Sequence, residues 1–184
     1  MMTRAMERVV VTGMGVASPL GCSVEEFWEG LLAGRSGTVA LTDPAYASHR
    51  SRIGALVTGF DEREHFDRKE ARRMSRSSHL AIVAAKQAIA EACLASGGVN
   101  ALEVGVIIGS SIGGFQASDS WFRDYYLHGH SSPMAIPISM NVGPASNLSI
   151  RYGFQGPLMT VDAACASAAH SIAYAFNLIR AGML

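Results

Sequence analysis

The sequence predicts an α/β fold with a largely parallel, buried sheet. Short apolar runs with β-branched residues have strand character at residues 8–12, 54–58, 104–109 and 158–161. Stretches with helical spacing of apolar residues separate these runs, and this alternation is typical of parallel sheets covered by helices. Apolar residues make up 49% of the 184 residues and charged residues only 16%, which is enough apolar material for a sizeable core.

The composition excludes several classes of protein. The formal net charge is zero, so nothing indicates a nucleic-acid or anionic-membrane partner. Cys22, Cys93 and Cys165 lie far apart and have neither metal-binding nor disulfide-framework spacing. No apolar run reaches membrane-spanning length, and residues 1–11 lack the apolar core of a signal peptide. We therefore expect a cytoplasmic protein.

The first predicted strand is Arg8 to Thr12, and Gly13-Met14-Gly15 follows it. A dinucleotide-binding fingerprint would need a third glycine at position 18, which holds Ser18 followed by Pro19. We therefore expect no nicotinamide site.

A capping box predicts the first helix. Ser23 is placed to cap it and Glu26 stands three residues later, and the helix is expected to stop near Gly34.

A basic stripe is predicted at the start of a long helix that ends at Gly97-Gly98. Lys69, Arg72, Arg73 and Arg76 recur at i, i+3, i+4 and i+7, which places them on one helix face. Most such charge runs are solvated helix faces.

The third strand, at residues 104–109, leads into the glycine-rich run Gly109–Gly114. This run lacks the Lys-Ser/Thr ending of a phosphate-binding P-loop, so close backbone packing is the better explanation for its glycines. A helix is expected from Phe115 to Tyr126. His128 and His130 in the following loop are weak evidence for a metal.

Cys165 is the candidate nucleophile because it lies where the strand at 158–161 turns into an Ala-rich helix. Unpaired N–H groups at a helix N-terminus favour a thiolate and can hold an oxyanion. The thiol is predicted to share the core-facing side of the helix, because apolar residues follow Cys165 at helical spacing. These residues are Ala168, Ala169, Ile172, Phe176 and Ile179. The alternative is that Cys165 is a small apolar filler, which is what free cysteines usually are.

Four segments resemble, in order and approximate spacing, the elongating β-ketoacyl-[acyl carrier protein] synthases. They are Arg8–Gly21, Gly109–Gly114, Tyr152–Pro157 and the nucleophile segment Val161–His170. The resemblance covers essentially the whole chain and corresponds to the N-terminal half of these enzymes.

The resemblance implies a thiolase-like fold, layered α-β-α-β-α in the full enzyme, of which residues 1–184 would be the first βαβ half. The second half, absent from this chain, would supply two histidines, a lysine and a glycine-rich segment. The implied activity is an acyl transfer to Cys165 followed by decarboxylative Claisen condensation with malonyl-acyl carrier protein. No metal or redox cofactor is implied, and the 184 residues alone are not expected to condense substrates.

The resemblance also implies binding residues and partners. The expected acyl-pocket residues are Ile112, Met134, Ala135 and Ile136. Lys69, Arg72 and Arg73 match positions that dock acyl carrier protein, and a homodimer is expected. The alternative function is a non-catalytic half-domain that dimerises or binds a carrier protein.

The helix after Cys165 is expected to have two apolar sides. Ile172, Phe176 and Ile179 should pack on this chain's own sheet. The side with Ala173, Ala175 and Leu178 should be left for the second half.

Overall fold

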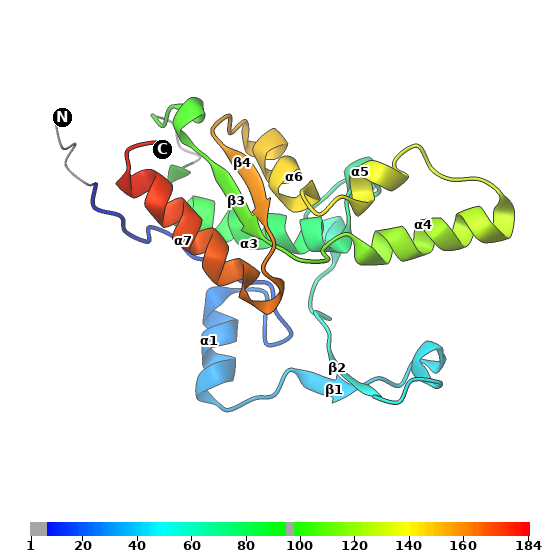
Figure 1. Cartoon of the computed structure of the whole chain (residues 1–184). Coiled ribbons are helices and arrows are strands. Elements are labelled where there is room, and N and C mark those ends of the chain that lie inside the picture. Colours follow the sequence, from blue (N-terminus) through cyan, green and yellow to red (C-terminus); the bar gives the residue numbers. More distant parts are fainter. Residues whose placement is uncertain (1–6, 95–97) are drawn as a thin grey trace.

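The computed structural model describes residues 7–94 and 98–184 and has a mixed α/β architecture (Figure 1). The helices and strands are, in chain order, α1 Val24–Leu32, β1 Thr38–Ala40, β2 Ile53–Ala55, α2 Arg68–Ala71, α3 Arg76–Glu91, β3 Val106–Gly109, α4 Phe115–His128, α5 Ala135–Ser139, α6 Gly143–Tyr152, β4 Leu158–Val161 and α7 Ser167–Arg180. Single 3₁₀ turns lie at Pro44–Tyr46, Glu62–Glu64, Ala101–Glu103 and Ala164–Ala166.

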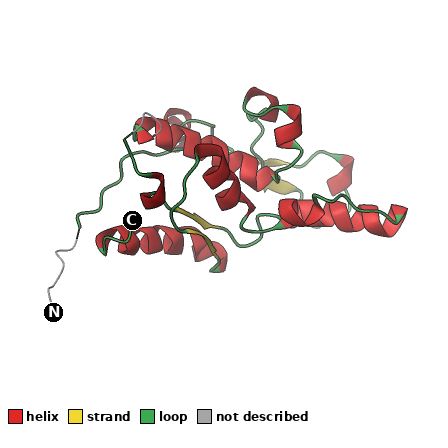
Figure 2. Cartoon of the chain, turned by 90° about the horizontal axis from the view of Figure 1, so that it is seen from above, coloured by secondary structure: helices red, strands yellow, loops and turns green. Residues whose placement is uncertain are grey.

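The centre of the molecule is a parallel pair of strands between helices. β3 and β4 pair in register from Val106 opposite Leu158 to Gly109 opposite Val161. Helix α7 packs against β3 and β4, α6 contacts the same two strands, and α3 packs on α6. Figure 2 shows the strands between α7 and the other helices. The predicted strand at 158–161 is confirmed to the residue, and the predicted strand at 104–109 begins two residues later than expected.

The buried core lies where α3, α6, β3 and the segment before α3 meet. Its members are Phe60, Phe66, Met74, Ile82, Val83, Val106, Ala145 and Leu148. The half-buried Tyr152 and Phe154, from the end of α6 and the turn after it, pack against this core.

The expected strand at residues 8–12 is wrong. This segment has no regular secondary structure, and Val10 and Val11 are exposed. The chain next runs along α3, where a Cβ on Gly13 would lie 2.1 Å from the Ala88 carbonyl oxygen. Met14 N donates to Glu91 Oε2 (2.8 Å), so side chains of α3 satisfy backbone groups that a neighbouring strand would otherwise pair.

The strand expected at 54–58 is only partly correct. Strand β2 covers residues 53–55 and pairs antiparallel with β1, in a sheet that is separate from the β3–β4 pair. The β1–β2 arm lies below the rest of the molecule (Figure 1). The largely parallel sheet of the prediction is therefore reduced, within the described residues, to the β3–β4 pair.

The capping box is confirmed in its main bond. Ser23 Oγ accepts from Glu26 N (3.1 Å) and α1 begins at Val24. The Glu26 carboxylate accepts from Cys22 N (2.9 Å) rather than from the cap residue itself. Residues upstream of the cap are thus tied to the first turn of the helix.

The long basic helix is wrong because the helix is broken between Ala71 and Arg76. Asp67 caps the short α2, and Ser75 begins α3 by accepting from Ser78 N. Met74 and Ser75 are buried in the break. The four basic residues therefore do not form one helical stripe. Helix α3 ends at Glu91, and position 97 of the predicted Gly97-Gly98 terminus lies outside the described residues.

Two further helices are longer than predicted. Helix α4 starts at Phe115 as expected but continues to His128, where Gly129 ends it in a left-handed conformation. Helix α6 starts at Gly143, four residues before the predicted Asn147, because Pro144 is compatible with the first turn of a helix.

Across residues 7–94 and 98–184, the helices are too short or too polar to cross a membrane.

Candidate active site

Cys165 lies in a tight connection at the carboxyl end of β4. The strand ends at Val161, a single 3₁₀ turn covers Ala164–Ala166, and α7 starts at Ser167. The Cys165 side chain is free and exposed. The predicted strand-to-helix position of the thiol is therefore confirmed, although a turn separates Cys165 from the helix.

Hydrogen bonds from short polar side chains fix the turn. Ser167 Oγ accepts from Ala163 N (2.9 Å) and donates to the Ala164 carbonyl oxygen (2.6 Å), so one buried hydroxyl closes the turn from both sides. Asp162 Oδ1 accepts from Ala164 N (3.1 Å). These bonds hold the backbone immediately before Cys165.

Ala164 is in the left-handed region with φ of 49°. This conformation is uncommon for a residue with a Cβ and costs free energy of about 1 kcal/mol or more. The surrounding bonds offset that cost, and the strained residue directly precedes the candidate nucleophile. Strain of this kind is concentrated at functional sites.

Gly109, the last residue of β3, supports the start of α7. A Cβ at this position would lie 2.4 Å from the carbonyl carbon of Ser167, which leaves no room for a side chain. The glycine-rich run therefore begins with a close backbone approach, as the sequence indicated. This approach places the first turn of α7 directly on the β3–β4 pair.

The predicted orientation of Cys165 and α7 is wrong. Cys165 is exposed and does not share a core-facing side with the helix. Ser167 and Ser171 are the buried residues of α7, and Ala175 and Leu178 continue that half-buried side. The 3₁₀ turn shifts the helical register relative to a count from Cys165.

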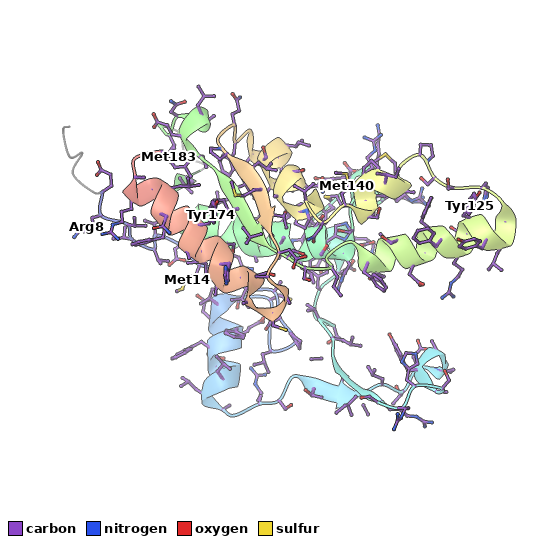
Figure 3. The ribbon with its side chains drawn as sticks, viewed as in Figure 1. Arg8, Met14, Tyr125, Met140, Tyr174 and Met183 are labelled. Atoms are coloured by element: carbon purple, nitrogen blue, oxygen red, sulfur yellow. The ribbon has the colours of Figure 1, made fainter. Side chains whose placement is uncertain are left out.

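The two predicted apolar sides of α7 are therefore largely exchanged, although Ala173 is exposed as expected. Ile172 is 70% exposed, Phe176 41% and Ile179 36%, so the side expected to pack on the sheet faces outwards. Small serine residues fit the close contact that Gly109 allows, whereas bulky side chains would not. Figure 3 shows Tyr174 on α7 and Met183 just after the helix, with Met14 from the N-terminal segment at the same side of the molecule.

The expected acyl-pocket residues lie in two places. Ile112 is in the loop after β3 and is 72% exposed. Met134 precedes α5, Ala135 is buried as its first residue, and Ile136 is exposed. The loop after β3 and the Cys165 turn leave the same edge of the sheet because β3 and β4 are parallel. Met134 instead lines a groove with the basic residues of α2.

That groove has a volume of about 600 Å³ and combines charged with apolar side chains. Lys69 and Arg73 line it together with Met134, Met140 and Ile150. Arg72 joins Lys69, Arg73 and Met134 in an adjoining hollow of about 510 Å³. The structure thus brings together the three predicted docking residues even though the helical stripe is absent.

Arg76 does not belong to this basic group. Its guanidinium lies 4.4 Å from the centroid of the Phe60 ring and donates to the Val57 carbonyl oxygen (3.0 Å). Arg76 is thus bound to the segment before α2 rather than to the groove.

Acidic groups border the basic groove. Backbone N–H groups of Glu70 and Lys69 donate to Asp67 and keep the pKa of its carboxyl below the usual range. Glu70 is paired with Arg151 from α6 at 2.5 Å. Lys69 and Arg73 therefore carry the positive charge that this groove offers to a partner.

Several residues that shape the site could not be found by reasoning from the sequence. The hydroxyl of Ser167 lies inside the nucleophile motif, but its double hydrogen bond depends on the fold. Asn141, between α5 and α6, binds the loop after β3 through its side chain. Over the described part of the chain, no group of three or more His, Cys, Asp or Glu side chains is arranged to hold a metal ion.

Comparisons with known proteins show the family of this chain. Residues 6–184 match the family model for the beta-ketoacyl synthase N-terminal domain. The chain is 38% identical to 3-oxoacyl-[acyl-carrier-protein] synthase 2 of Synechocystis over 96% of its own length and 43% of the relative's, and 37% identical to the Vibrio cholerae protein of the same name over 95% and 43%. The chain belongs to the beta-ketoacyl synthase family. It spans less than half the length of these relatives.

Solved ketosynthases share the fold. The ishigamide ketosynthase/chain length factor superposes with a TM-score of 0.88 at 24% identity, over 98% of this chain and 46% of that one. A type II polyketide synthase ketosynthase, solved in complex with its acyl-carrier protein, gives a TM-score of 0.78 at 19% identity, over 94% of this chain and 46% of that one. The expected thiolase-like fold class is therefore confirmed.

Proposed function

We propose that residues 1–184 form the nucleophile-bearing first half of a β-ketoacyl-[acyl carrier protein] synthase. In this function Cys165 accepts an acyl group from a carrier-protein thioester. The observation that carries the proposal is an exposed cysteine, held by a strained and hydrogen-bonded turn, in a chain that belongs to this family.

The proposed chemistry has two steps. The Cys165 thiolate attacks the acyl thioester carbonyl, the tetrahedral intermediate collapses, and the carrier thiolate leaves, so that the acyl group is bonded to sulfur. Malonyl-carrier protein then loses carbon dioxide, and its carbanion attacks the acyl-Cys165 carbonyl and expels the thiolate. The backbone N–H of Cys165 is the proposed oxyanion donor within this chain. The histidines and lysine for the second step belong to the second half.

Intact-mass analysis after incubation with an acyl-carrier protein tests the first step. The wild-type chain should gain the mass of the acyl group, and Cys165→Ala should gain nothing. Cys22→Ala is the matched control and should still be acylated. Acylation that persists in Cys165→Ala would contradict the proposal.

The proposed partner is acyl carrier protein, docked at Lys69, Arg72 and Arg73. These residues line the groove or the adjoining hollow together with apolar side chains, which fits an acidic protein that also presents apolar side chains. If the chain binds a carrier protein but Cys165 takes no acyl group, the alternative function of a non-catalytic binding module would be favoured.

The proposed acyl pocket comprises Ile112, Met134, Ala135 and Ile136. Ile112 lies at the same sheet edge as the Cys165 turn, which supports its place in the pocket. Met134 and the exposed Ile136 are at the start of α5.

A homodimer is proposed as the assembly. Helix α4 extends away from the core and carries exposed apolar side chains that a second copy could cover, namely Phe122, Tyr125, Tyr126 and Leu127 (Figure 1). The proposed compartment is the cytoplasm, because acyl transfer needs Cys165 as a reduced thiol and Cys165 is free.

A further inference from the structure

The loop Ser110–Gly114 has a fixed position relative to the Cys165 turn. It follows β3 as the Cys165 turn follows β4, and the two parallel strands end opposite each other at Gly109 and Val161. Ser110 N donates to the Val161 carbonyl oxygen (3.1 Å), which ties the start of the loop to the end of β4. Any displacement of this loop therefore changes the surface at the sheet edge where Cys165 lies.

One amide side chain holds both ends of the loop. Asn141 Oδ1 accepts from Ser110 Oγ (2.7 Å) and from Gly113 N (3.2 Å). Asn141 Nδ2 donates to the Ser110 carbonyl oxygen (2.6 Å). The Asn141 carbonyl oxygen also accepts from Thr160 Oγ1 on β4 (3.4 Å), so the residue bridges the loop and the strand that leads to Cys165.

The loop is supported from the opposite side as well. Ser77, in the first turn of α3, donates through its hydroxyl to the Gly113 carbonyl oxygen. Gly113 is thus held at its N–H by Asn141 and at its carbonyl by Ser77. Between these anchors Ile112 is left 72% exposed, with its direction set by the anchored backbone on each side.

We propose that Asn141 is a positioning residue that determines which acyl chains Cys165 accepts, by fixing the conformation of the Ser110–Gly114 loop and the direction of Ile112. This inference rests on the proposed function. A side chain that both accepts and donates is required, because the loop presents N–H and O–H donors together with the Ser110 carbonyl acceptor. An aspartate would keep the acceptor but would place an oxygen against the Ser110 carbonyl.

The first measurement is amide hydrogen exchange of Gly113 in the wild-type chain and in Asn141→Ala, Asn141→Asp and Asn147→Ala. Asn147 is the matched control, because it is another half-buried amide that donates to Ser78 Oγ and to the Gly143 carbonyl oxygen and makes none of the bonds to the loop. Asn141→Ala should accelerate exchange at Gly113 by about tenfold, as expected for one lost hydrogen bond. Asn147→Ala should leave this rate unchanged.

The second measurement is the relative rate of Cys165 acylation by carrier-protein thioesters from acetyl to palmitoyl, followed by intact mass. Asn141→Ala and Asn141→Asp should change the ratio of long-chain to short-chain acylation by several-fold, whereas Asn147→Ala should keep the wild-type ratio. A purely structural role would lower all rates together and leave the ratio unchanged.

The outcomes separate this inference from the proposed function. A wild-type chain that takes no acyl group on Cys165 overturns both. A wild-type chain that is acylated, with an unchanged chain-length ratio in both Asn141 variants, overturns only the role of Asn141. An unchanged rate of Gly113 amide exchange in Asn141→Ala would show that Asn141 does not hold the Ser110–Gly114 loop in place.

Discussion

Cys165 and Cys93 are both exposed, but they lie at opposite ends of helices. Cys165 lies in the single 3₁₀ turn that leads into α7, whereas Cys93 follows the C-terminal end of α3. The N-terminal end of a helix carries partial positive charge and the C-terminal end partial negative charge. The two exposed thiols therefore lie at helix ends of opposite partial charge.

We predict that Cys165 is alkylated fastest of the three cysteines at neutral pH. Iodoacetamide labelling followed by peptide mapping should find the label at Cys165 before Cys93, and at half-buried Cys22 last. Labelling of Cys93 at an equal or greater rate would show that exposure alone decides the reactivity.

His79 is predicted to make stability depend on pH. Burial lowers the pKa of its imidazole in the folded chain, against the opposing effects of the bond to the Ala71 carbonyl oxygen (3.1 Å) and of nearby Glu62. Glu62 Oε2 lies 3.3 Å from Nδ1 but is not aligned for a hydrogen bond. As the pH falls below the unfolded value of about 6.5, the unfolded chain takes up a proton that the folded chain resists.

The free energy of unfolding should therefore fall on acidification from about pH 7 to pH 5, by at most about 1.4 kcal/mol per pH unit from this residue. Urea denaturation at several pH values measures the slope. His79→Gln should flatten it, and exposed His170→Gln should retain it. An equal slope in the wild-type chain and His79→Gln would rule out this role for His79.

Single residues also explain part of what could be predicted from the sequence. Ser23 and Glu26 indicate a helix start through bonds within four residues, and these bonds form. The left-handed Ala164 has no such local sign, because alanine rarely adopts that conformation and here depends on Asp162 and Ser167. The position of Cys165 was therefore predictable, but its turn was not.

At the scale of helices and strands, the sequence-based predictions succeeded where a run of residues has the bonding partner that its pattern implies. The run at 158–161 is a strand because β3 lies beside it, whereas the similar run at 8–12 stays irregular and the residues directly after it bond to α3. The helix expected through Arg72 and Arg76 fails because Ser75 offers a better cap and Met74 is buried in the core. The helical spacing of the basic residues indicates neither the cap at Ser75 nor the burial of Met74.

The basic residues of α2 and the break after it give the third prediction. Arg72→Glu should weaken the binding of acyl carrier protein several-fold at low salt, because it reverses a charge in the hollow that adjoins the basic groove. The loss should shrink towards ~1 M salt, where the Debye length is about 3 Å. Fluorescence anisotropy of a labelled carrier protein measures both effects.

Arg50→Glu on the β1–β2 arm is the matched control for this charge reversal and should bind as the wild-type chain does. Arg76→Glu should instead destabilise the fold, since Arg76 contacts Phe60 and the Val57 carbonyl oxygen. Equal losses of carrier-protein affinity for Arg72→Glu and Arg50→Glu would indicate that the basic group is an ordinary solvated surface.

On the scale of the whole molecule, helix α7 covers one side of the β3–β4 pair with small residues and turns large apolar ones outwards. Ile172, Phe176 and Ile179 are exposed on α7, and Val10, Val11 and Met14 are exposed in the N-terminal segment. Glu7 N donates to the Arg180 carbonyl oxygen (3.2 Å), so the two segments lie next to each other. Together they form an extended apolar surface, of a kind that soluble monomers rarely expose.

We predict that the polypeptide of residues 1–184 associates through this surface rather than remaining a monodisperse monomer. Covering roughly 300 Å² of apolar surface contributes about 7.5 kcal/mol at ~25 cal/mol per Å², before the cost of association is subtracted. Analytical ultracentrifugation should show concentration-dependent association that Ile172→Lys together with Phe176→Lys reduces. Leu102→Lys is the matched control, because Leu102 is 63% exposed on a 3₁₀ turn outside this surface, and it should leave the association unchanged. A single monomeric species of the wild-type polypeptide at all concentrations would contradict the prediction, as would equal effects of the α7 and Leu102 substitutions.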